Sequence, residues 1–344
     1  MKDLNTTRSE APARLIELIQ MRLISEAIYV AAALGIADLL ADAPQMIDRL
    51  ADATGTSTRS LRRVMRALSS FGIFSEDSDG RFALAPMGEL LRRDAVGSLS
   101  AASLLSGGES GARTIQLLLE CVRTGENANQ KLSGANWMDS LQGNPEQLKV
   151  FNAAMTAFST LHFTGVLEAY DFSQAKKIVD VGGGHGKIIS EILKNNPGMR
   201  GILFDKPHAF EGGQRTVALF GLTDCCEVVS GDFFVSVPAG ADAYLLSRVI
   251  HDWDDDKAVA ILKVVRGAIA PHGKLLLLEN MLRPAASGAV YPILSDLNML
   301  IHTGGCERTE PEYLALYHAA GFELTKTVAT KSPTGTTVIE GRPV

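Results

Sequence analysis

The chain has 344 residues, a length that accommodates two domains of ordinary size. Hydrophobic residues make up 46% and charged residues 21%, as in a typical globular protein, and the net charge of −6 argues against nucleic acid or an anionic membrane as a partner. The four cysteines fit neither a disulfide framework nor a zinc site, and the first fifteen residues lack the apolar core of a secretory signal. We therefore expect a cytoplasmic enzyme with reduced thiols, no bound metal and no membrane partner.

Residues 12–125 carry Ala, Leu and Arg at the three- and four-residue spacing of helices. Short helices are predicted at 46–51 and 57–68, with Gly72 just beyond the second as a C-terminal cap. Segments 73–75 and 81–84 flank a turn and predict a β-hairpin. Two helices followed by a hairpin is a winged-helix pattern. We assign residues 1–105 to this N-terminal domain and 106–170 to a helical connector.

A winged helix raises the alternative of a DNA-binding regulator. Residues 44–94 contain eight basic side chains and seven acidic ones, a net charge of only +1. Because phosphate contacts dominate affinity for DNA, this balance is a poor footprint for a nucleic-acid partner. An interface or solvated helix face is the favoured interpretation of the arginines.

From residue 175 onward, apolar strands alternate with helices. Strands are predicted at 178–181, 200–205, 226–230, 243–247 and 273–279, and the first is followed by a helix at 187–195. Continuous apolar strands with helical crossovers indicate a mostly parallel sheet covered by helices on both faces. The predicted fold class is therefore α/β, with a Rossmann-like domain at 171–344.

A glycine-rich loop follows the first predicted strand. Gly182 and Gly184 would let a ligand approach the backbone, and Asp205, at the end of the second strand, could accept both ribose hydroxyls of a nucleoside. A dinucleotide is the alternative ligand. Its motif G-x-G-x-x-G requires a third glycine where this chain has Lys187, which argues against a nicotinamide-dependent oxidoreductase.

S-adenosylmethionine fits the same loop better because it has no pyrophosphate to place on a helix N-terminus. Asp180 could supply an acid near its sulfonium and amino-acid tail. Asp232 and Phe233, at the end of the third strand, could hydrogen-bond the adenine amine and pack against the ring.

His251 follows the fourth strand and is the candidate general base. It is predicted at the carboxyl edge of the sheet, where open α/β folds bind ligands, and neutral imidazole takes a proton readily near neutral pH. Glu279 and Glu307 reach the same edge and could orient its second nitrogen. The competing interpretation is a surface histidine before a helix whose first turn carries Asp254 to Asp256.

The segments just quoted resemble the plant-caffeate and hydroxyindole type of O-methyltransferase, which includes bacterial enzymes acting on phenazines and polyketides. The order and spacing of six pieces match and span most of the chain, namely 151–170, 179–186, Asp205, 231–234, 248–255 and 304–309. Plant members carry Lys where this chain has Ser247, so the resemblance moves that cofactor contact to Arg248. Some relatives have lost the histidine, whereas this chain keeps it.

The resemblance implies transfer of a methyl group from S-adenosylmethionine to a hydroxyl of a small aromatic acceptor, leaving S-adenosylhomocysteine. It also implies a homodimer formed through the N-terminal domain, with His251 as base beside Glu279 and Glu307. Cofactor contacts are expected from Gly182, Asp205, Asp232, Phe233 and Arg248. The acceptor pocket is expected to be lined by Met155, Phe158, His162, Phe163, Asn298, Met299 and His302. Ordinary core packing is the alternative for these pocket residues, and a nitrogen or carbon acceptor stays open because the pocket sets it.

Overall fold

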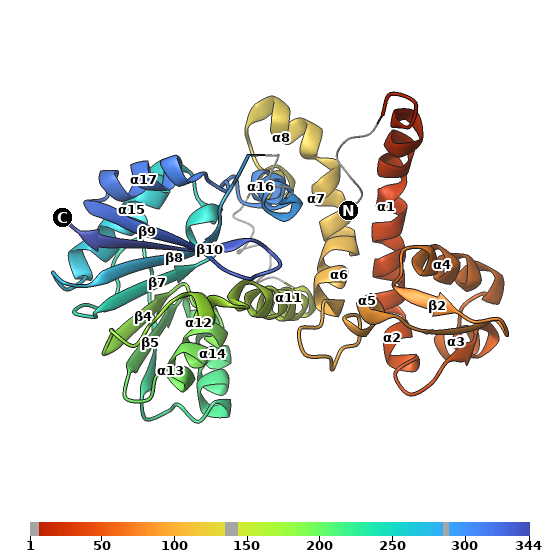
Figure 1. The fold of residues 1–344 in the computed structure, drawn as a ribbon, viewed down its shortest axis with the longest axis horizontal. Helices are drawn as coiled ribbons and strands as arrows, with labels where there is room; N and C mark the ends of the chain where they lie inside the picture. Colours follow the sequence, from red (N-terminus) through yellow and green to blue (C-terminus); the bar gives the residue numbers. More distant parts are fainter. Residues whose placement is uncertain (1–6, 135–143, 285–288) are drawn as a thin grey trace. The chain divides into compact units, whose positions relative to one another are not determined.

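The computed structural model describes residues 7–134, 144–284 and 289–344, and the chain divides into two compact units. The first unit comprises residues 1–113 and 144–158, and the second comprises 114–143 and 159–344. The segment 106–170, expected to form a connector, is thus shared between the units. Helices α7 (Glu109–Gln116) and α11 (Pro145–Phe163) each cross a boundary between them. Figure 1 labels the elements.

The first unit packs helices against a small antiparallel sheet. Its helices are α1 (Ala11–Ala33), α2 (Ile36–Leu39), α3 (Ile47–Thr54), α4 (Thr58–Ser70), α5 (Pro86–Glu89) and α6 (Ser100–Gly107). The sheet has the order β1 (Gln45–Met46), β3 (Arg81–Leu84) and β2 (Phe74–Glu76). This arrangement confirms the two predicted helices and the hairpin, and it adds the short strand β1.

Residue patterns explain how these elements form. In α4 the buried side chains are Leu61, Met65 and Leu68, spaced to lie on one helical face. Gly72 adopts a φ of 72° after the helix, and the N–H of Ile73 bonds back to the carbonyl of Leu68. This left-handed glycine ends the helix as predicted and turns the chain into β2.

The second unit contains a seven-stranded sheet with helices on both faces (Figure 1). The strand order is β6 (Cys226–Ser230), β5 (Arg200–Asp205), β4 (Lys177–Val181), β7 (Ala243–Ser247), β8 (Lys274–Asn280), β10 (Thr336–Pro343) and β9 (Phe322–Ala329). The first five strands are parallel, whereas β10 runs antiparallel to both of its neighbours. The Rossmann-like, mostly parallel sheet is therefore confirmed, and β9 and β10 extend it.

The helices of the second unit are α8 (Leu118–Thr124), α9 (Ala128–Ser133), α12 (Val166–Ala169), α13 (Lys187–Asn195), α14 (Pro207–Leu219), α15 (Asp255–Ala268), α16 (Val290–His302) and α17 (Glu310–Ala319). Most of them cover the sheet or follow its strands, whereas α8 and α9 contact α16. A single 3₁₀ turn, η1 (Ile250–Asp252), leads from β7 toward α15.

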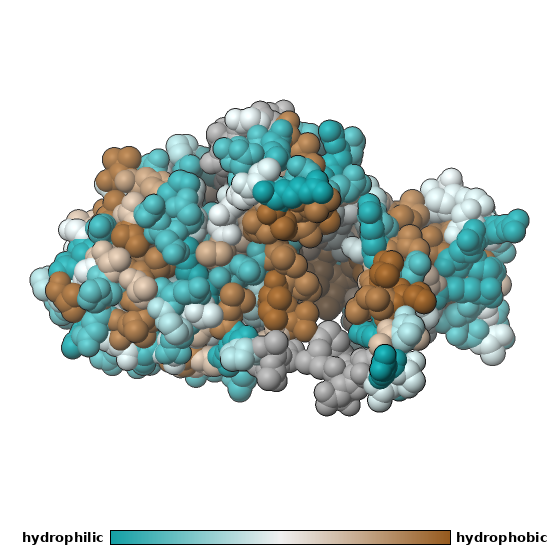
Figure 2. Space-filling view, turned by 90° about the horizontal axis from the view of Figure 1, so that it is seen from above, coloured by the Kyte–Doolittle hydropathy of each residue, from teal (hydrophilic) through white to brown (hydrophobic). Residues whose placement is uncertain are grey.

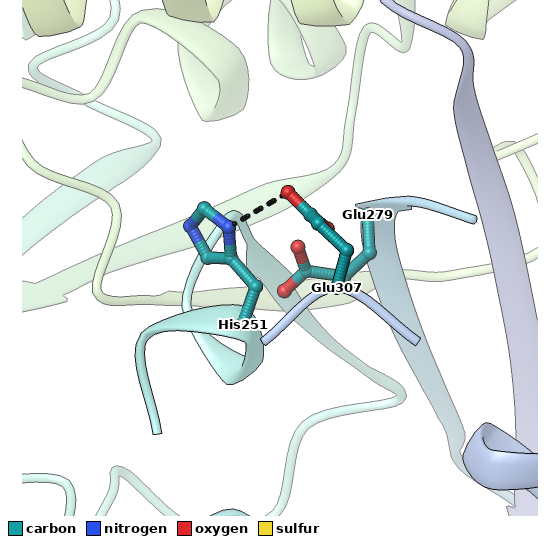
Figure 3. Close-up of side chains that lie close together, drawn as sticks. All are labelled: His251, Glu279 and Glu307. Atoms are coloured by element: carbon teal, nitrogen blue, oxygen red, sulfur yellow. Dashed lines mark hydrogen bonds and ion pairs between the residues drawn. The ribbon is translucent and has the colours of Figure 1, made fainter. Parts of the chain in front are cut away.

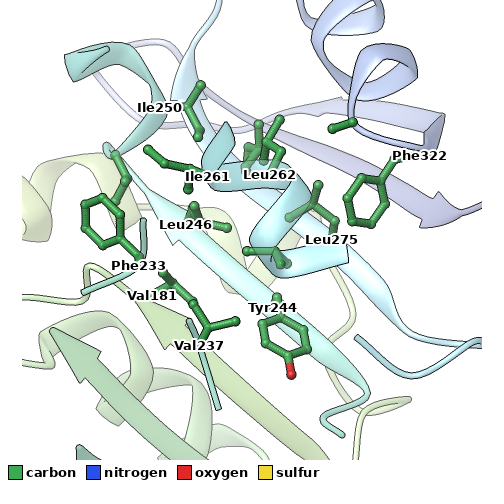
Figure 4. Packing of buried hydrophobic residues seen from close by; sticks show 14 of the residues in the cluster. Val181, Phe233, Val237, Tyr244, Leu246, Ile250, Ile261, Leu262, Leu275 and Phe322 are labelled. Carbon is green, nitrogen blue, oxygen red and sulfur yellow. The ribbon is translucent and has the colours of Figure 1, made fainter. Parts of the chain in front are cut away.

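Alternate residues of each central strand point into two hydrophobic clusters. Tyr244 and Leu246 of β7 pack with Ile261 and Leu262 of α15 on one face (Figure 4). Leu245, between them in the sequence, packs on the opposite face with the buried side of α13. Because both faces are covered, β7 is buried from Ala243 to Leu246, and this packing fixes the position from which the chain leaves its carboxyl end.

Candidate active site

Four candidate segments emerge from one edge of the sheet in the second unit. The glycine loop follows β4, Asp205 ends β5, the turn carrying His251 follows β7, and Glu279 lies near the end of β8. These strands are parallel, so their carboxyl ends share this edge. The sheet topology therefore brings these predicted residues together, as expected for a ligand site in an open α/β fold.

The glycine loop and Asp205 form one half of the site. Gly182 and Gly184 have φ values of 71° and 57°, a backbone region that favours glycine. The N–H of Gly184 donates to Asp205 Oδ2 at 2.7 Å, and the N–H of Lys206 donates to Oδ1 at 2.6 Å. A hollow beside this contact is lined by Gly184, Leu203, Asp205, Lys206, Ala209, Phe210, Val228 and Val229. It combines an anchored carboxylate with apolar walls, as a nucleoside requires.

Asp180 lies beneath the loop and is fully buried. A Cβ added at Gly183 would lie 2.5 Å from Asp180 Oδ2, so the loop passes directly over this carboxyl group. Burial, and then the like charge of Asp205, raise the pKa of Asp180 to about 7. The backbone N–H of Ile189 opposes this rise, but burial outweighs it. The geometry favours support of the loop from below, and direct contact with a cofactor stays a prediction.

Phe233 closes the apolar side of the loop. It is buried, and its ring meets Trp253 edge-on at 6.3 Å between centroids. A Cβ at Gly182 would lie 3.7 Å from the Phe233 ring and 2.7 Å from Val249, so only glycine fits between them. Asp232 is exposed beside this ring and accepts from the N–H of Phe234 at 2.9 Å. An exposed acid next to a buried aromatic ring fits an adenine base.

The other half of the site is centred on His251, which is only 5% exposed. Its Nδ1 lies 3.2 Å from Glu307 Oε1 (Figure 3). Burial and Arg248 oppose a charged imidazole, but Asp252, Glu279 and Glu307 outweigh them, and the pKa of His251 is raised. The competing interpretation, a surface histidine before a helix, does not fit this burial, although Asp254 does cap α15 by accepting from the N–H of Lys257.

Glu307 is an ionised carboxylate at the centre of a buried network. Burial opposes its charge, but Arg248, His251 and Ser295 together lower its pKa to about 2. Its Oε1 accepts from Arg248 Nη1 at 2.8 Å and from Ser295 Oγ at 2.6 Å, in addition to His251. Because ionised Glu307 only accepts hydrogen bonds, Nδ1 of neutral His251 carries the proton and Nε2 carries the lone pair.

Arg248 joins the remaining members of this network. Nη2 donates to Ser295 Oγ at 3.0 Å, and Nη1 lies 3.7 Å from Glu279 Oε2. Hydrogen bonding orients the Asn280 amide so that its oxygen accepts from Nη1 at 2.9 Å. Arg248 has a φ of 57°, the one positive value at a non-glycine residue in the described ranges. Such a conformation costs about 1–2 kcal/mol and persists only where surrounding contacts enforce it.

Ser247, the residue before Arg248, is the other predicted cofactor contact in this segment. Its Oγ is buried and has no hydrogen-bond partner in the described part of the chain.

Glu279 contacts the turn rather than the imidazole ring. Its Oε1 accepts from the N–H groups of Val249 and Ile250 at 3.1 and 2.9 Å. Arg308 holds the same turn from the other side, donating to the carbonyls of Ile250 and Trp253 at 3.2 and 2.8 Å. The two predicted carboxylates therefore have different positions, Glu279 against the backbone of the turn and Glu307 against the side chain of His251.

His251, Glu279 and Glu307 place one candidate ligand atom each within 4.8 Å of the others. This spacing would suit a cation, but the Arg248 guanidinium already lies 2.8 Å from Glu307 and 3.7 Å from Glu279. A metal ion would have to compete with that fixed positive charge, so the donor set fits an ion-pair network better than a metal site.

The predicted acceptor residues fall in both units. Met155 and Phe158 belong to the first unit, whereas His162 and Phe163, farther along α11, belong to the second. His162 Nδ1 lies 2.7 Å from Thr334 Oγ1, and burial, with Arg248 and His251 nearby, holds the pKa of His162 well below its usual range.

Helix α16 carries the other predicted acceptor residues. Asn298 is exposed there, and Met299 and His302 are half-buried.

Sequence reasoning missed three members of the network, Ser295, Asn280 and Arg308. Arg308 lies inside a segment that the sequence singled out, yet its hydrogen bonds to the turn are visible only in three dimensions. Ser295 lies in an otherwise apolar helical pattern, where one serine carries no signal of its own.

Comparison with known families gives two matches. Residues 16–94 match the model of an O-methyltransferase dimerisation domain, and residues 116–323 match that of an O-methyltransferase domain. The chain is 40% identical over 330 residues to phenazine O-methyltransferase PhzM of Lysobacter antibioticus, covering 96% of each protein.

Two further relatives differ in their acceptors. The chain is 34% identical to 8-amino-8-demethylriboflavin N,N-dimethyltransferase of Streptomyces davaonensis, covering 86% of each. It also resembles the crystal structure of an O-methyltransferase from neocarzinostatin biosynthesis in complex with S-adenosylmethionine and 2-hydroxy-5-methyl naphthoic acid. That match has a TM-score of 0.78 and 31% identity, and it covers 93% of this chain and 96% of that one.

Proposed function

Because the chain belongs to the S-adenosylmethionine-dependent O-methyltransferase family that carries an N-terminal dimerisation domain, we propose that it methylates a hydroxyl group of a small aromatic acceptor. The main support is the contact of His251 Nδ1 with ionised Glu307 at 3.2 Å. This contact holds the proton on Nδ1 and leaves the lone pair of Nε2 free to accept a proton. His251 lies at the same edge of the sheet as the glycine loop and Asp205, because β7, β4 and β5 are parallel. A proton acceptor beside the cofactor loop is what methylation of a weakly acidic hydroxyl requires.

In the proposed reaction, His251 Nε2 takes the proton of the acceptor hydroxyl as its oxygen forms a bond to the methyl carbon. S-adenosylmethionine supplies that carbon as an electrophile, and the bond to sulfur breaks to leave S-adenosylhomocysteine. The imidazolium that forms is stabilised by Glu307, Glu279 and Asp252, the three anions that raise the pKa of His251. The proton then leaves to solvent with the product.

Asp205 is proposed to accept the ribose hydroxyls, and Asp232 with Phe233 to hold the adenine. Gly182 and Gly184 would face the cofactor through their backbone. The Arg248 guanidinium points into the Glu307 network, so a cofactor contact from Arg248, or from Ser247 before it, is proposed only through the backbone. The fit rests on the anchored Asp205 carboxylate and the apolar walls beside it.

An amino acceptor is the second candidate, favoured by the 34% identity to an N,N-dimethyltransferase. A neutral amine attacks with its own lone pair and can lose its proton afterwards, so it depends less on a base. Loss of His251 would therefore slow O-methylation much more than N-methylation.

The chain is further proposed to act as a cytoplasmic homodimer. Apolar side chains exposed along α1 support the dimer, because large exposed apolar surfaces mark interaction sites. They are Leu15, Ile16, Leu18, Ile19, Met21 and Leu23. Figure 2 shows hydrophobic surface in brown.

Residues 145–169 are apolar and long enough to cross a bilayer, but Gly165, with a φ of 74°, separates α11 from α12. Core helices of soluble proteins reach the same length and hydropathy.

The test compares wild-type protein with His251→Ala. Calorimetric titration with S-adenosylhomocysteine should give similar affinity in both, with NAD as the control that does not bind. Turnover of hydroxylated phenazines and naphthoates should fall by about 10²–10⁴ in the variant, the usual effect of losing a general base. Unchanged turnover on a hydroxyl acceptor would refute the role of His251.

A further inference from the structure

The buried hydroxyl of Ser295 connects helix α16 to the base. It is 5% exposed, donates to Glu307 Oε1 at 2.6 Å and accepts from Arg248 Nη2 at 3.0 Å. A serine hydroxyl has one proton, and Arg248 can only donate, so the directions of both bonds are fixed. Ser295 therefore bridges the cation and the anion of the network without touching His251.

Glu307 Oε1 receives three donors, which makes their relative geometry important. Ser295 and Arg248 approach at 2.6 and 2.8 Å, whereas His251 Nδ1 lies at 3.2 Å. The imidazole therefore makes the longest of these contacts. Oε2 of the same carboxylate has no hydrogen-bond partner among the described residues. Nothing on the Oε2 side fixes the rotation of the carboxylate, so the donors on Oε1 must set it.

We propose that Ser295 is a positioning residue for the base, whose hydroxyl fixes Arg248 and Glu307 in the one arrangement where Oε1 faces Nδ1 of His251. The proposal deepens the function proposed above and rests on it for its catalytic consequence. Its geometric part stands on the contacts of Ser295 with Glu307 and Arg248 alone. Without the hydroxyl, Arg248 Nη2 loses its acceptor, and the guanidinium is free to shift toward Glu307 or Glu279.

The position of Ser295 in α16 gives this link a second meaning. Asn298, Met299 and His302 follow it at three, four and seven residues, the spacing of one helical face. These are the residues of α16 predicted to contact the acceptor. One helix thus carries both the acceptor contacts and the hydroxyl that aligns the base, so the acceptor and the proton-accepting pair share a rigid support.

The charged groups around the base define what removing the hydroxyl should do. His251 is faced by Arg248, which opposes its charge, and by Asp252, Glu279 and Glu307, which favour it, with His162 nearby. The Ser295 hydrogen bond helps to lower the pKa of Glu307. Its removal lets the Glu307 carboxylate turn away from Nδ1 while Arg248 remains close to the ring, which should lower the pKa of His251.

The experiment uses Ser295→Ala, with Ser173→Ala as a matched control at an exposed serine of the same unit. We expect Ser295→Ala to lower kcat by about 10- to 100-fold with little change in the KM for the acceptor, because misaligned groups cost turnover more than binding. The acid limb of the kcat/KM profile should move to lower pH, because the imidazole loses part of its contact with the Glu307 anion. Ser295→Thr, which keeps the hydroxyl, should recover most of the lost turnover.

NMR titration of the His251 ring separates this proposal from the proposed function, because it needs no turnover. Ser295→Ala should lower the midpoint of the ring titration relative to wild type and to Ser173→Ala. An unchanged midpoint together with wild-type kcat would overturn the positioning role, even if His251→Ala proves that the base is correct. A shifted midpoint in a protein whose His251→Ala variant keeps full turnover would instead uphold the link and reject the base.

Discussion

Replacing Glu307 by Gln tests the centre of the network with almost no change in shape. The amide oxygen can occupy the position of Oε1 and still accept from Arg248, Ser295 and His251. What disappears is the negative charge, and hydrogen bonds to charged groups contribute about 1 kcal/mol more than neutral ones. Two of the three donors, Arg248 and His251, depend on that charge.

The expected loss in the free energy of unfolding is about 1–3 kcal/mol, less than the 3–5 kcal/mol typical of a broken buried pair. The reduction is smaller because Glu279 Oε2, 3.7 Å from Arg248, still balances the guanidinium. Turnover should fall by about 10²–10³, since the imidazolium loses the anion that contacts it.

The pH profile gives the sign of the effect. Imidazolium cannot act as a base, so if His251 has its proposed role, wild-type activity should rise with pH through the raised pKa of His251. In Glu307→Gln one favouring anion is gone and Arg248 remains, so that pKa falls and the acid limb moves to lower pH. Formation of S-adenosylhomocysteine from pH 5 to 9, thermal unfolding and calorimetry would be measured together. Wild-type kcat in Glu307→Gln, with an unshifted acid limb, would refute the assignment of Glu307 as the partner of the base.

Three further outcomes are expected. Asp205→Ala should abolish measurable binding of S-adenosylhomocysteine by calorimetry. Asp242→Ala is the control and should keep binding, because Asp242 accepts from the N–H groups of Lys176 and Lys177 at the opposite end of the strands. Equal losses of affinity in the two variants would contradict the ribose assignment. Gly305→Ala should lower kcat sharply, because the added Cβ would lie 2.1 Å from the carbonyl oxygen of His251. Gly267→Ala should keep wild-type turnover, because a Cβ there meets open space. Full activity of Gly305→Ala would show that the turn carrying His251 can shift without loss of function. Asp180→Asn should make the unliganded protein progressively more stable than wild type in urea unfolding as the pH rises from 5 to 8. The folded state keeps a proton on Asp180 up to about pH 7, whereas the unfolded state releases it near the ordinary pKa of 3.8. The stability of the wild type therefore falls as the pH rises between these values. Parallel pH profiles of the two proteins would refute a raised pKa of Asp180.

Buried regular structure was the part of the fold that the sequence made predictable. Strands 200–205, 226–230 and 243–247 and the helix at 187–195 have the predicted bounds, because continuous or periodic apolar residues mark burial directly. The strands at 322–329 and 336–343 were not predicted. The first is largely exposed, and the buried residues of the second include Thr336, Thr337, Glu340 and Gly341, so they do not form a continuous apolar run.

The sequence predicted which residues lie at one edge of the sheet, but not which contacts each of them makes. Strand ends identified His251, Glu279 and Asp205, because parallel topology brings carboxyl ends to one edge. The sequence left open which glutamate orients the base, since that depends on side-chain distances. The geometry assigns the ring contact to Glu307 and the backbone contact to Glu279. Ser295 was invisible for the same reason.

The pairing of β10 with β8 has a consequence for how the enzyme is made. Thr336 and Thr337 lie opposite Asn280 and Glu279, so the strand that carries the buried glutamate gains its second neighbour from residues near the C-terminus. During synthesis β8 emerges long before β10 and has an unpaired edge in the meantime, a state prone to association with other chains. The nascent protein can therefore fold its cofactor loop early, whereas the carboxylate behind the base becomes locked only when the last strand arrives.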